Sequence, residues 1–128
     1  MASPAVARKL LLKPGHKAWV LNAPNGYVES LDPLPEGVEL SATAPAECDF
    51  VQLFVRDSAE LEQLLPQAVA SCKPDGLLWV CYLKGGKRAG TDLNRDVLWA
   101  KMGERGLTGV TLVAIDGDWS AMRFRWQP

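Results

Sequence analysis

Two residue types are scarce in this chain of 128 residues, and each scarcity argues against a class of protein. Histidine occurs once, at His16, which leaves no set of ligands typical of a zinc site and no base in a signature pairing with a serine. The three cysteines are odd in number and show no C-x-x-C spacing, which is untypical of a disulfide framework. We therefore expect a reduced, cytoplasmic protein with no metal site.

Long apolar runs and net charge are also lacking. No apolar run approaches the ~20 residues that a membrane-spanning helix needs. The first 14 residues lack the apolar core and the small-residue cleavage site of a secretory signal. The net charge of −1 argues against general binding to nucleic acid. We expect neither a membrane nor a nucleic acid among the partners.

No catalytic constellation can be recognised in the sequence. None of the serines lies in a signature turn, and Asp116 and Asp118 flank Gly117 in a hairpin turn, where acidic residues serve the turn itself. We therefore assign no catalytic residue.

Apolar residues make up 48% of the chain and five residues are Trp, as expected of one packed domain over residues 1–128. The order of strands and helices predicts an α/β fold of Rossmann-like type, a mostly parallel sheet with helices on both faces and a C-terminal antiparallel hairpin. The predicted strands are Ala18–Leu21, Val38–Leu40, Phe50–Val55, Gly76–Leu83, Thr111–Ile115 and Ala121–Trp126. The predicted helices are Val6–Leu12, a segment from Asp57 to about Cys72, and Leu93–Glu104.

The helix that starts at Asp57 is the best defined in the sequence. Asp57 and Glu60 have the spacing of a capping box, in which each side chain binds a backbone N–H of the first turn. Pro66 is expected to bend or restart this helix midway. Its apolar face repeats every 3.6 residues and consists of Leu61, Leu64, Leu65, Ala68 and Cys72.

The helix Leu93–Glu104 has more apolar surface than one contact can bury. Leu93, Val97 and Ala100 are predicted to face the sheet, so the remaining apolar residues predict a self-association interface and hence a homodimer. These interface residues are Leu98, Trp99 and Met102. The alternative is that the N-terminal helix or the end of the chain covers them.

A basic, glycine-rich loop precedes the same helix. Its cations are close to the unpaired N–H groups of a helix start, which favours a small anionic ligand such as phosphate or carboxylate. The candidate ligand-binding residues are Lys84, Lys87, Arg88, Thr91 and Asn94, with Arg95 as a further member. The alternative is an ordinary surface loop, since the loop lacks the spacing of a P-loop.

Three segments together resemble class I S-adenosylmethionine-dependent methyltransferases, and more closely a family of small uncharacterised bacterial proteins with a reduced, degenerate form of that fold. The segments are LLLKPGHKAWVLNAPNG, SCKPDGLLWVCYLK and VTLVAIDGDWSAMRFRW. The first segment is similar to the leader helix, first strand and cofactor loop of such methyltransferases. The second is similar to the turn and the central strand of these enzymes, and the third to their closing hairpin. The resemblance implies a truncated methyltransferase-like domain.

The chain departs from that family where the cofactor would bind. The resemblance implies an acidic residue at the end of the first strand and a G-x-G-x-G loop, but the sequence has Val20, Asn22 and Pro24, and only Gly26 remains. Pro24 adds a ring and removes an N–H where the backbone would approach the cofactor. The segment before Phe50 is also too short for the usual second and third strands with their helices. Glu39 is a candidate replacement for the acidic residue, but we expect no usable S-adenosylmethionine binding and no cofactor.

Two hypotheses for the function stay open. The preferred one is a non-catalytic domain that binds a partner or a second copy of itself. The alternative is an enzyme or sensor that binds a nucleotide or S-adenosylmethionine through the loop after the central strand. In that case Asn22, Asn25 and Gly26 would form the opposite wall of the site.

Overall fold

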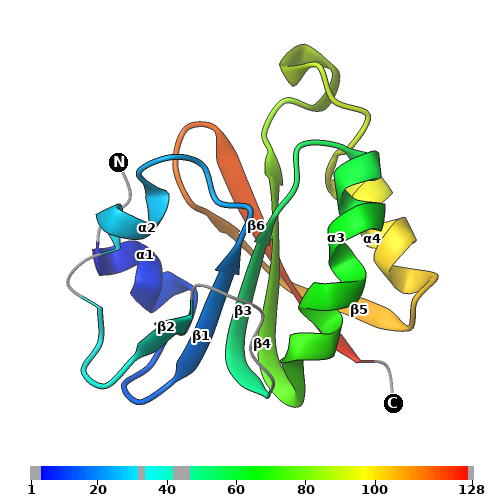
Figure 1. Cartoon of the computed structure of the whole chain (residues 1–128). Helices are drawn as coiled ribbons and strands as arrows, with labels where there is room; N and C mark the ends of the chain where they lie inside the picture. Colours follow the sequence, from blue (N-terminus) through cyan, green and yellow to red (C-terminus); the bar gives the residue numbers. More distant parts are fainter. Residues whose placement is uncertain (1–3, 32–33, 42–46, 127–128) are drawn as a thin grey trace.

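The computed structural model describes residues 4–31, 34–41 and 47–126 and contains one six-stranded sheet of order β2-β1-β3-β4-β6-β5 (Figure 1). The strands β2, β1, β3 and β4 are parallel, whereas β6 is antiparallel to both of its neighbours. The predicted sheet with its C-terminal antiparallel hairpin is thus confirmed. The strands are β1 Lys17–Leu21, β2 Glu39–Ser41, β3 Cys48–Phe54, β4 Cys72–Leu83, β5 Leu107–Ala114 and β6 Trp119–Trp126.

Helices cover both faces of the sheet, as predicted (Figure 1). One face carries α1 (Pro4–Lys9) and α2 (Tyr27–Ser30), and the other carries α3 (Ser58–Ser71) and α4 (Arg95–Gly103). A 3-10 helix, η1 (Gly86–Ala89), lies in the loop after β4. Among the described residues, no helix has the length and apolar character that crossing a membrane requires.

The core is divided by the sheet into two apolar clusters. Phe50 and Phe54 of β3 pack under α1 and α2, whereas Val51 and Leu53 pack under α3 and α4. Successive side chains of a strand point to opposite faces, so a strand covered on both sides must be apolar throughout. This explains why β3 shows almost no polar alternation in the sequence.

The Asp57 cap at the start of α3 is confirmed, whereas Glu60 binds the N–H of the residue before the cap instead of that of Asp57 itself. Asp57 Oδ1 accepts a hydrogen bond of 2.8 Å from the Glu60 N–H, and Glu60 Oε1 accepts one of 2.7 Å from the Arg56 N–H. Leu61 and Ala68 are buried on the face that the spacing predicts. The helix continues through Pro66 without a restart, because Pro66 lies on the exposed side, where water can satisfy the carbonyl that it leaves unpaired.

The predicted orientation of α4 is wrong. Asn94 caps this helix, its Oδ1 accepting from the Val97 N–H at 2.8 Å, so Leu93 precedes the helix instead of opening its inner face. Leu98 and Met102 face the sheet and are 0% exposed, which removes both from any surface. Trp99 alone of the three predicted interface residues is exposed, at 49%. The dimer itself stays a prediction.

Candidate functional site

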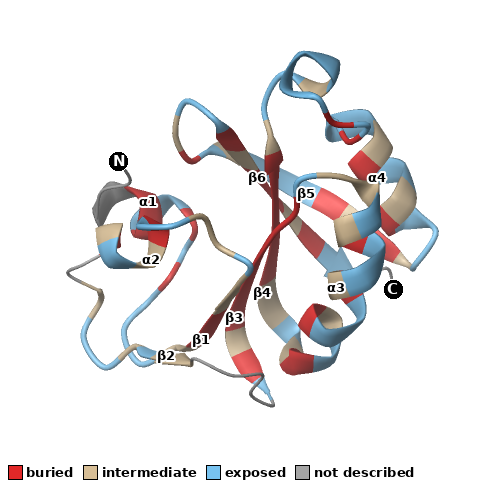
Figure 2. Cartoon of the chain, turned by 45° about the horizontal axis from the view of Figure 1, so that its top comes forward, coloured by how far each residue is buried: buried red, intermediate tan, exposed pale blue. Residues whose placement is uncertain are grey.

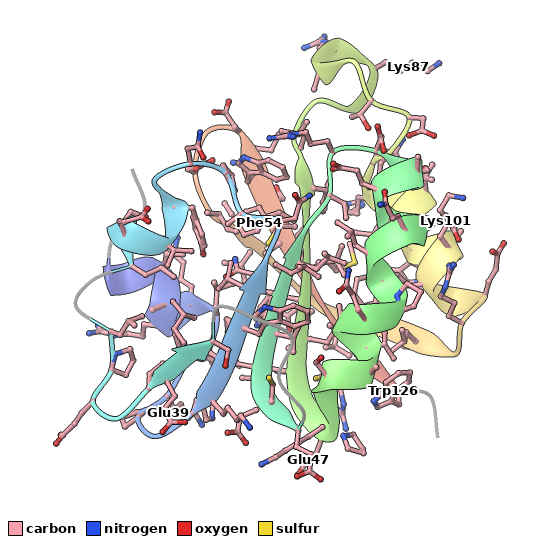
Figure 3. The ribbon with its side chains drawn as sticks, viewed as in Figure 1. Glu39, Glu47, Phe54, Lys87, Lys101 and Trp126 are labelled. Atoms are coloured by element: carbon pink, nitrogen blue, oxygen red, sulfur yellow. The ribbon has the colours of Figure 1, made fainter. Side chains whose placement is uncertain are left out.

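The direction in which successive strands are added to the sheet reverses between β1 and β3. The chain leaves β1 toward β2 on one side and leaves β3 toward β4 on the other, and open α/β sheets bind ligands outside the carboxyl ends of two such strands. Here Asn22, directly after β1, donates a hydrogen bond from Nδ2 to the carbonyl oxygen of Phe54, the last residue of β3, at 2.9 Å. Figure 3 shows Phe54 at this end of the sheet. A side chain therefore bridges the crevice where a ligand would be expected.

The loop after β1 is short and tightly turned. Asn22 has a left-handed backbone with φ 63°, which asparagine adopts more readily than most residues. Gly26, with φ 84°, precedes α2, and the Tyr27 N–H donates to the Pro24 carbonyl at 3.1 Å. The helix that follows has only four residues, so few peptide dipoles add up at its start.

A buried polar network lies beneath this loop. The Tyr27 hydroxyl donates to Gln52 Oε1 at 3.1 Å and lies 2.8 Å from Gln52 Nε2, which also donates to Cys81 Sγ at 3.3 Å. Burial raises the pKa of Tyr27 far above its usual range and that of Cys81 to about 12, so both groups stay neutral. Sequence reasoning missed this network, although a glutamine inside an otherwise apolar strand is a signal for it.

Two depressions lie at the carboxyl edge, and they differ in charge. The first, which we call the loop depression, has a volume of about 430 Å³ and contains the predicted residues Asn25 and Gly26. Two acidic residues and no basic residue line it, which makes it unsuited to an anion. Its lining consists of Pro24, Asn25, Gly26, Tyr27, Ser30, Asp116, Asp118 and Trp119.

The second depression, which we call the basic depression, has a volume of about 510 Å³ and lies between the loop after β4 and the start of α4. Three basic side chains and one acidic side chain line it, including Arg95. Its lining consists of Tyr82, Leu83, Lys84, Gly85, Gly86, Lys87, Asn94, Arg95, Asp96, Leu112 and Ser120.

Two of the ligand residues predicted in and after the basic loop, Arg88 and Thr91, lie outside the basic depression. Arg88 is an exposed residue of η1. Its neighbour Lys87 projects from the tip of the loop in Figure 3. Thr91 is buried, and its Oγ1 accepts a hydrogen bond of 3.0 Å from the Leu93 N–H. Thr91 therefore serves the local backbone instead of a ligand.

Lys84 separates the two depressions. Its Nζ donates to the carbonyl of Asp116, and its N–H donates to the carbonyl of Asp118 at 2.8 Å, so Lys84 fixes the hairpin between β5 and β6 against the end of β4. The predicted single site with two walls is accordingly divided: Asn25 and Gly26 lie in one depression, and Lys84, Lys87 and Asn94 line the other. Neither lining includes Asn22.

The remaining candidates for cofactor or metal binding do not converge. Glu39 is the first residue of β2, and Figure 3 shows it at the end of the sheet opposite to Lys87. Val20 is half-buried in β1. In the part of the chain that the structure describes, no three His, Cys, Asp or Glu side chains are grouped as metal ligands.

Solved structures with a similar fold are S-adenosylmethionine-dependent methyltransferases and related proteins. A fibrillarin pre-rRNA processing protein from Methanococcus jannaschii is 13% identical, with a TM-score of 0.65 over 91% of this chain and 68% of its own. A ribosomal protein L11 methylase from Lactobacillus delbrueckii subsp. bulgaricus is 11% identical, with a TM-score of 0.60 over 97% and 76%. A TehB-like SAM-dependent methyltransferase from Corynebacterium glutamicum is 13% identical, with a TM-score of 0.59 over 95% and 87%.

Sequence comparison adds no closer relative: no protein-family model matches the chain, and a search of curated proteins gave no match. Identities of this size show a shared fold alone. The chain has the fold of class I S-adenosylmethionine-dependent methyltransferases in a reduced form.

Proposed function

We propose that this chain is a non-catalytic binding domain that keeps a methyltransferase-like fold but does not use S-adenosylmethionine. The observation that carries the proposal is the hydrogen bond from Asn22 to the Phe54 carbonyl, which bridges the crevice between β1 and β3. In a doubly wound fold this crevice is the ligand site, and glycines at its loop allow the backbone to approach the ligand. Here a side chain occupies that position.

The neighbouring residues support the same conclusion. Pro24 adds a ring to the loop and has no N–H to donate. The helix after the loop has four residues, and Glu39 lies at the amino end of its strand, away from the crevice. These residues do not fit the methyl donor, and we derive no methyl transfer from them.

Titration calorimetry with S-adenosylmethionine and S-adenosylhomocysteine tests this proposal. We expect no binding by the wild-type chain, and micromolar affinity for either compound would overturn the proposal. The double variant Asn22→Gly with Pro24→Gly restores G-x-G-x-G at positions 22, 24 and 26, so it should bind more tightly than the wild type. If the double variant binds neither compound more tightly than the wild type does, the short α2 would be the reason for the missing affinity instead.

A second candidate function is the binding of a phosphate-bearing small molecule in the basic depression. Lys84, Lys87 and Arg95 line it beside the capped start of α4, where the unpaired N–H groups and the helix dipole also favour an anion. Arg95 is exposed, and its Nε lies 3.3 Å from Asp96 Oδ1. A ligand phosphate would therefore compete with the exposed Asp96 carboxylate for the Arg95 guanidinium. A surface ion pair of this kind contributes little and is readily exchanged.

Thermal unfolding in the presence of inorganic phosphate or ATP tests the second candidate. A ligand at a hundredfold excess over its Kd stabilises the folded state by about 2.7 kcal/mol, which gives a measurable rise in Tm. Lys87→Ala with Arg95→Ala should abolish that rise. The matched control is Arg56→Ala with Arg88→Ala, which removes two exposed cations outside the depression. An equal loss in both double variants would indicate a general charge effect.

A further inference from the structure

The two edges of the sheet are protected very differently. An edge strand has unpaired N–H and C=O groups, and proteins usually limit access to them with short strands, charges or proline. The edge strand β2 has three residues and begins with the exposed Glu39. The opposite edge, β5, has eight residues with the sequence LTGVTLVA, which contains neither charge nor proline. In Figure 2 much of β5 has the colour of exposed residues.

Most of the outer edge of β5 is regular enough to pair with another strand. Its register against β6 shifts once, between Gly109 and Thr111, and a shift of this kind disturbs the edge only locally. The four residues from Thr111 to Ala114 pair with β6 without interruption, so their outward backbone groups keep the spacing of a normal strand.

An apolar patch lies beside this edge. Trp99 of α4, Val110 and Leu112 are 49%, 44% and 49% exposed, and all three line a depression of about 420 Å³ between α4 and β5. We call these three residues the edge patch. The Trp99 ring lies against Gly109, where an added Cβ would come within 2.8 Å of the ring. Because the ring already has a fixed place, burying it in an interface costs little additional side-chain entropy.

The charges at the rim of the edge patch suit a copy of the same surface. Arg95 and Asp96 lie next to each other in the lining of that depression, and both are exposed. A two-fold axis places the same patch on both subunits, so an arginine of one copy can approach the aspartate of the other. A rim with one charge of each sign provides no attraction for a strongly charged partner.

We propose that the β5 edge and the edge patch bind a second copy of this chain. A two-fold axis perpendicular to the sheet reverses the direction of β5, so the two β5 strands pair antiparallel and the sheets of the two subunits become continuous. The backbone groups of residues 111–114 then form hydrogen bonds with the second copy, and apolar contacts of the edge patch stabilise the same interface. This inference goes beyond the proposed function, since it holds whichever small molecule the chain binds.

The oligomeric state of the full chain tests the inference directly. Light scattering and sedimentation should show a dimer for the wild type, and Leu112→Lys should weaken dimerisation by at least about tenfold in Kd by placing a charge on the edge. The matched control is Leu11→Lys, since Leu11 is also exposed, at 39%, but lies after α1 on the other face of the sheet. A wild-type monomer at high concentration, or a Leu112→Lys variant that dimerises like the control, overturns the inference.

Hydrogen exchange locates the interface independently of mutation. The amides of residues 111–114 should exchange more slowly as the protein concentration rises, whereas those of β2 should not change. If the amides of β2 or α3 became protected as the concentration rises and those of β5 did not, the interface would lie elsewhere and the inference would be overturned. Calorimetry with S-adenosylmethionine remains a separate measurement, so failure of the proposed function and failure of the dimer are distinguishable.

Discussion

Asn22 Nδ2 lies 2.9 Å from the carbonyl oxygen of Phe54, so one amide side chain joins the ends of two parallel strands that are 32 residues apart in the sequence. The same asparagine has a left-handed backbone. Its two roles can be separated by mutation, because glycine removes the side chain but tolerates the backbone, whereas alanine loses on both counts.

We expect Asn22→Ala to lower the free energy of unfolding by about 2 kcal/mol, through the lost hydrogen bond and the cost of a left-handed alanine. Asn22→Gly should cost about 1 kcal/mol less than Asn22→Ala. Urea denaturation of both variants measures the difference. Equal losses would show that the backbone of Asn22 is not strained.

The Tyr27–Gln52 contact should behave as a coupled pair. Tyr27→Phe leaves the buried Gln52 amide with fewer partners and should cost about 1–3 kcal/mol of unfolding free energy. In the double variant with Gln52→Leu, no polar group is left unpaired between them, so the total loss should be smaller than the sum of the two single losses. A double-mutant cycle by urea denaturation provides the measurement, and strictly additive losses would contradict the contact.

Asp49 should make the protein sensitive to acid. Its carboxylate accepts from the Lys17 N–H at 2.9 Å and from Lys73 Nζ at 2.8 Å, and these bonds, the Lys17 bond first, lower the pKa of Asp49. A lowered folded-state pKa gives stability that is present above about pH 4 and is lost as the pH falls through the folded-state value.

We therefore expect the wild type to lose more unfolding free energy on acidification than Asp49→Asn does, measured by urea denaturation between neutral pH and about pH 3. Asp75→Asn is the control, because Asp75 is an exposed carboxylate on the neighbouring strand β4, two residues after Lys73, with no hydrogen bond of this kind among the described residues. A wild type that matches Asp49→Asn over this range would show that the Lys17 bond does not stabilise the charged form.

Alkaline pH should destabilise the protein through its thiols. Burial raises the pKa of Cys72 to about 11 and that of Cys81 to about 12, above the value of about 8.5 in an unfolded chain. A raised folded-state pKa gives stability that is complete below about pH 8.5 and is lost as the pH rises toward the folded-state value. Denaturation at neutral pH and at about pH 10 should show this loss, and Cys72→Ala should lessen it. An unchanged unfolding free energy over that range would contradict the burial of these thiols.

Much of the fold could be predicted because local signals and the global arrangement agree. The apolar run of β3, the capping box at Asp57 and the hairpin at Gly117 each specify an element without reference to the rest of the chain. The placement of Trp79 in the core also follows from its position in the uncharged, largely apolar run Gly76–Leu83 of the central strand β4. The Trp79 side chain is buried, and its Nε1 donates to the Leu10 carbonyl at 2.9 Å.

The site was harder to predict because it depends on contacts between distant segments. The sequence places Lys84 beside other cations, but only the fold shows that its side chain reaches the Asp116 carbonyl and divides the carboxyl edge. The inner face of α4 was predicted wrongly because Leu93 was counted as helical, although it precedes the Asn94 cap. A shift in one helix boundary thus changed which of the apolar residues were assigned to the surface.

The sheet keeps the apolar cluster beneath α1 and α2 apart from the cluster beneath α3 and α4. Substitutions that share no neighbours have nearly additive effects on stability, so the two layers can accumulate changes independently. The loop after β1 and the four-residue α2 belong to the first layer, so both can change while the second layer still holds the strands in order. In a protein of this architecture, the order of the strands can therefore stay fixed while the loops and helices on one face of the sheet change.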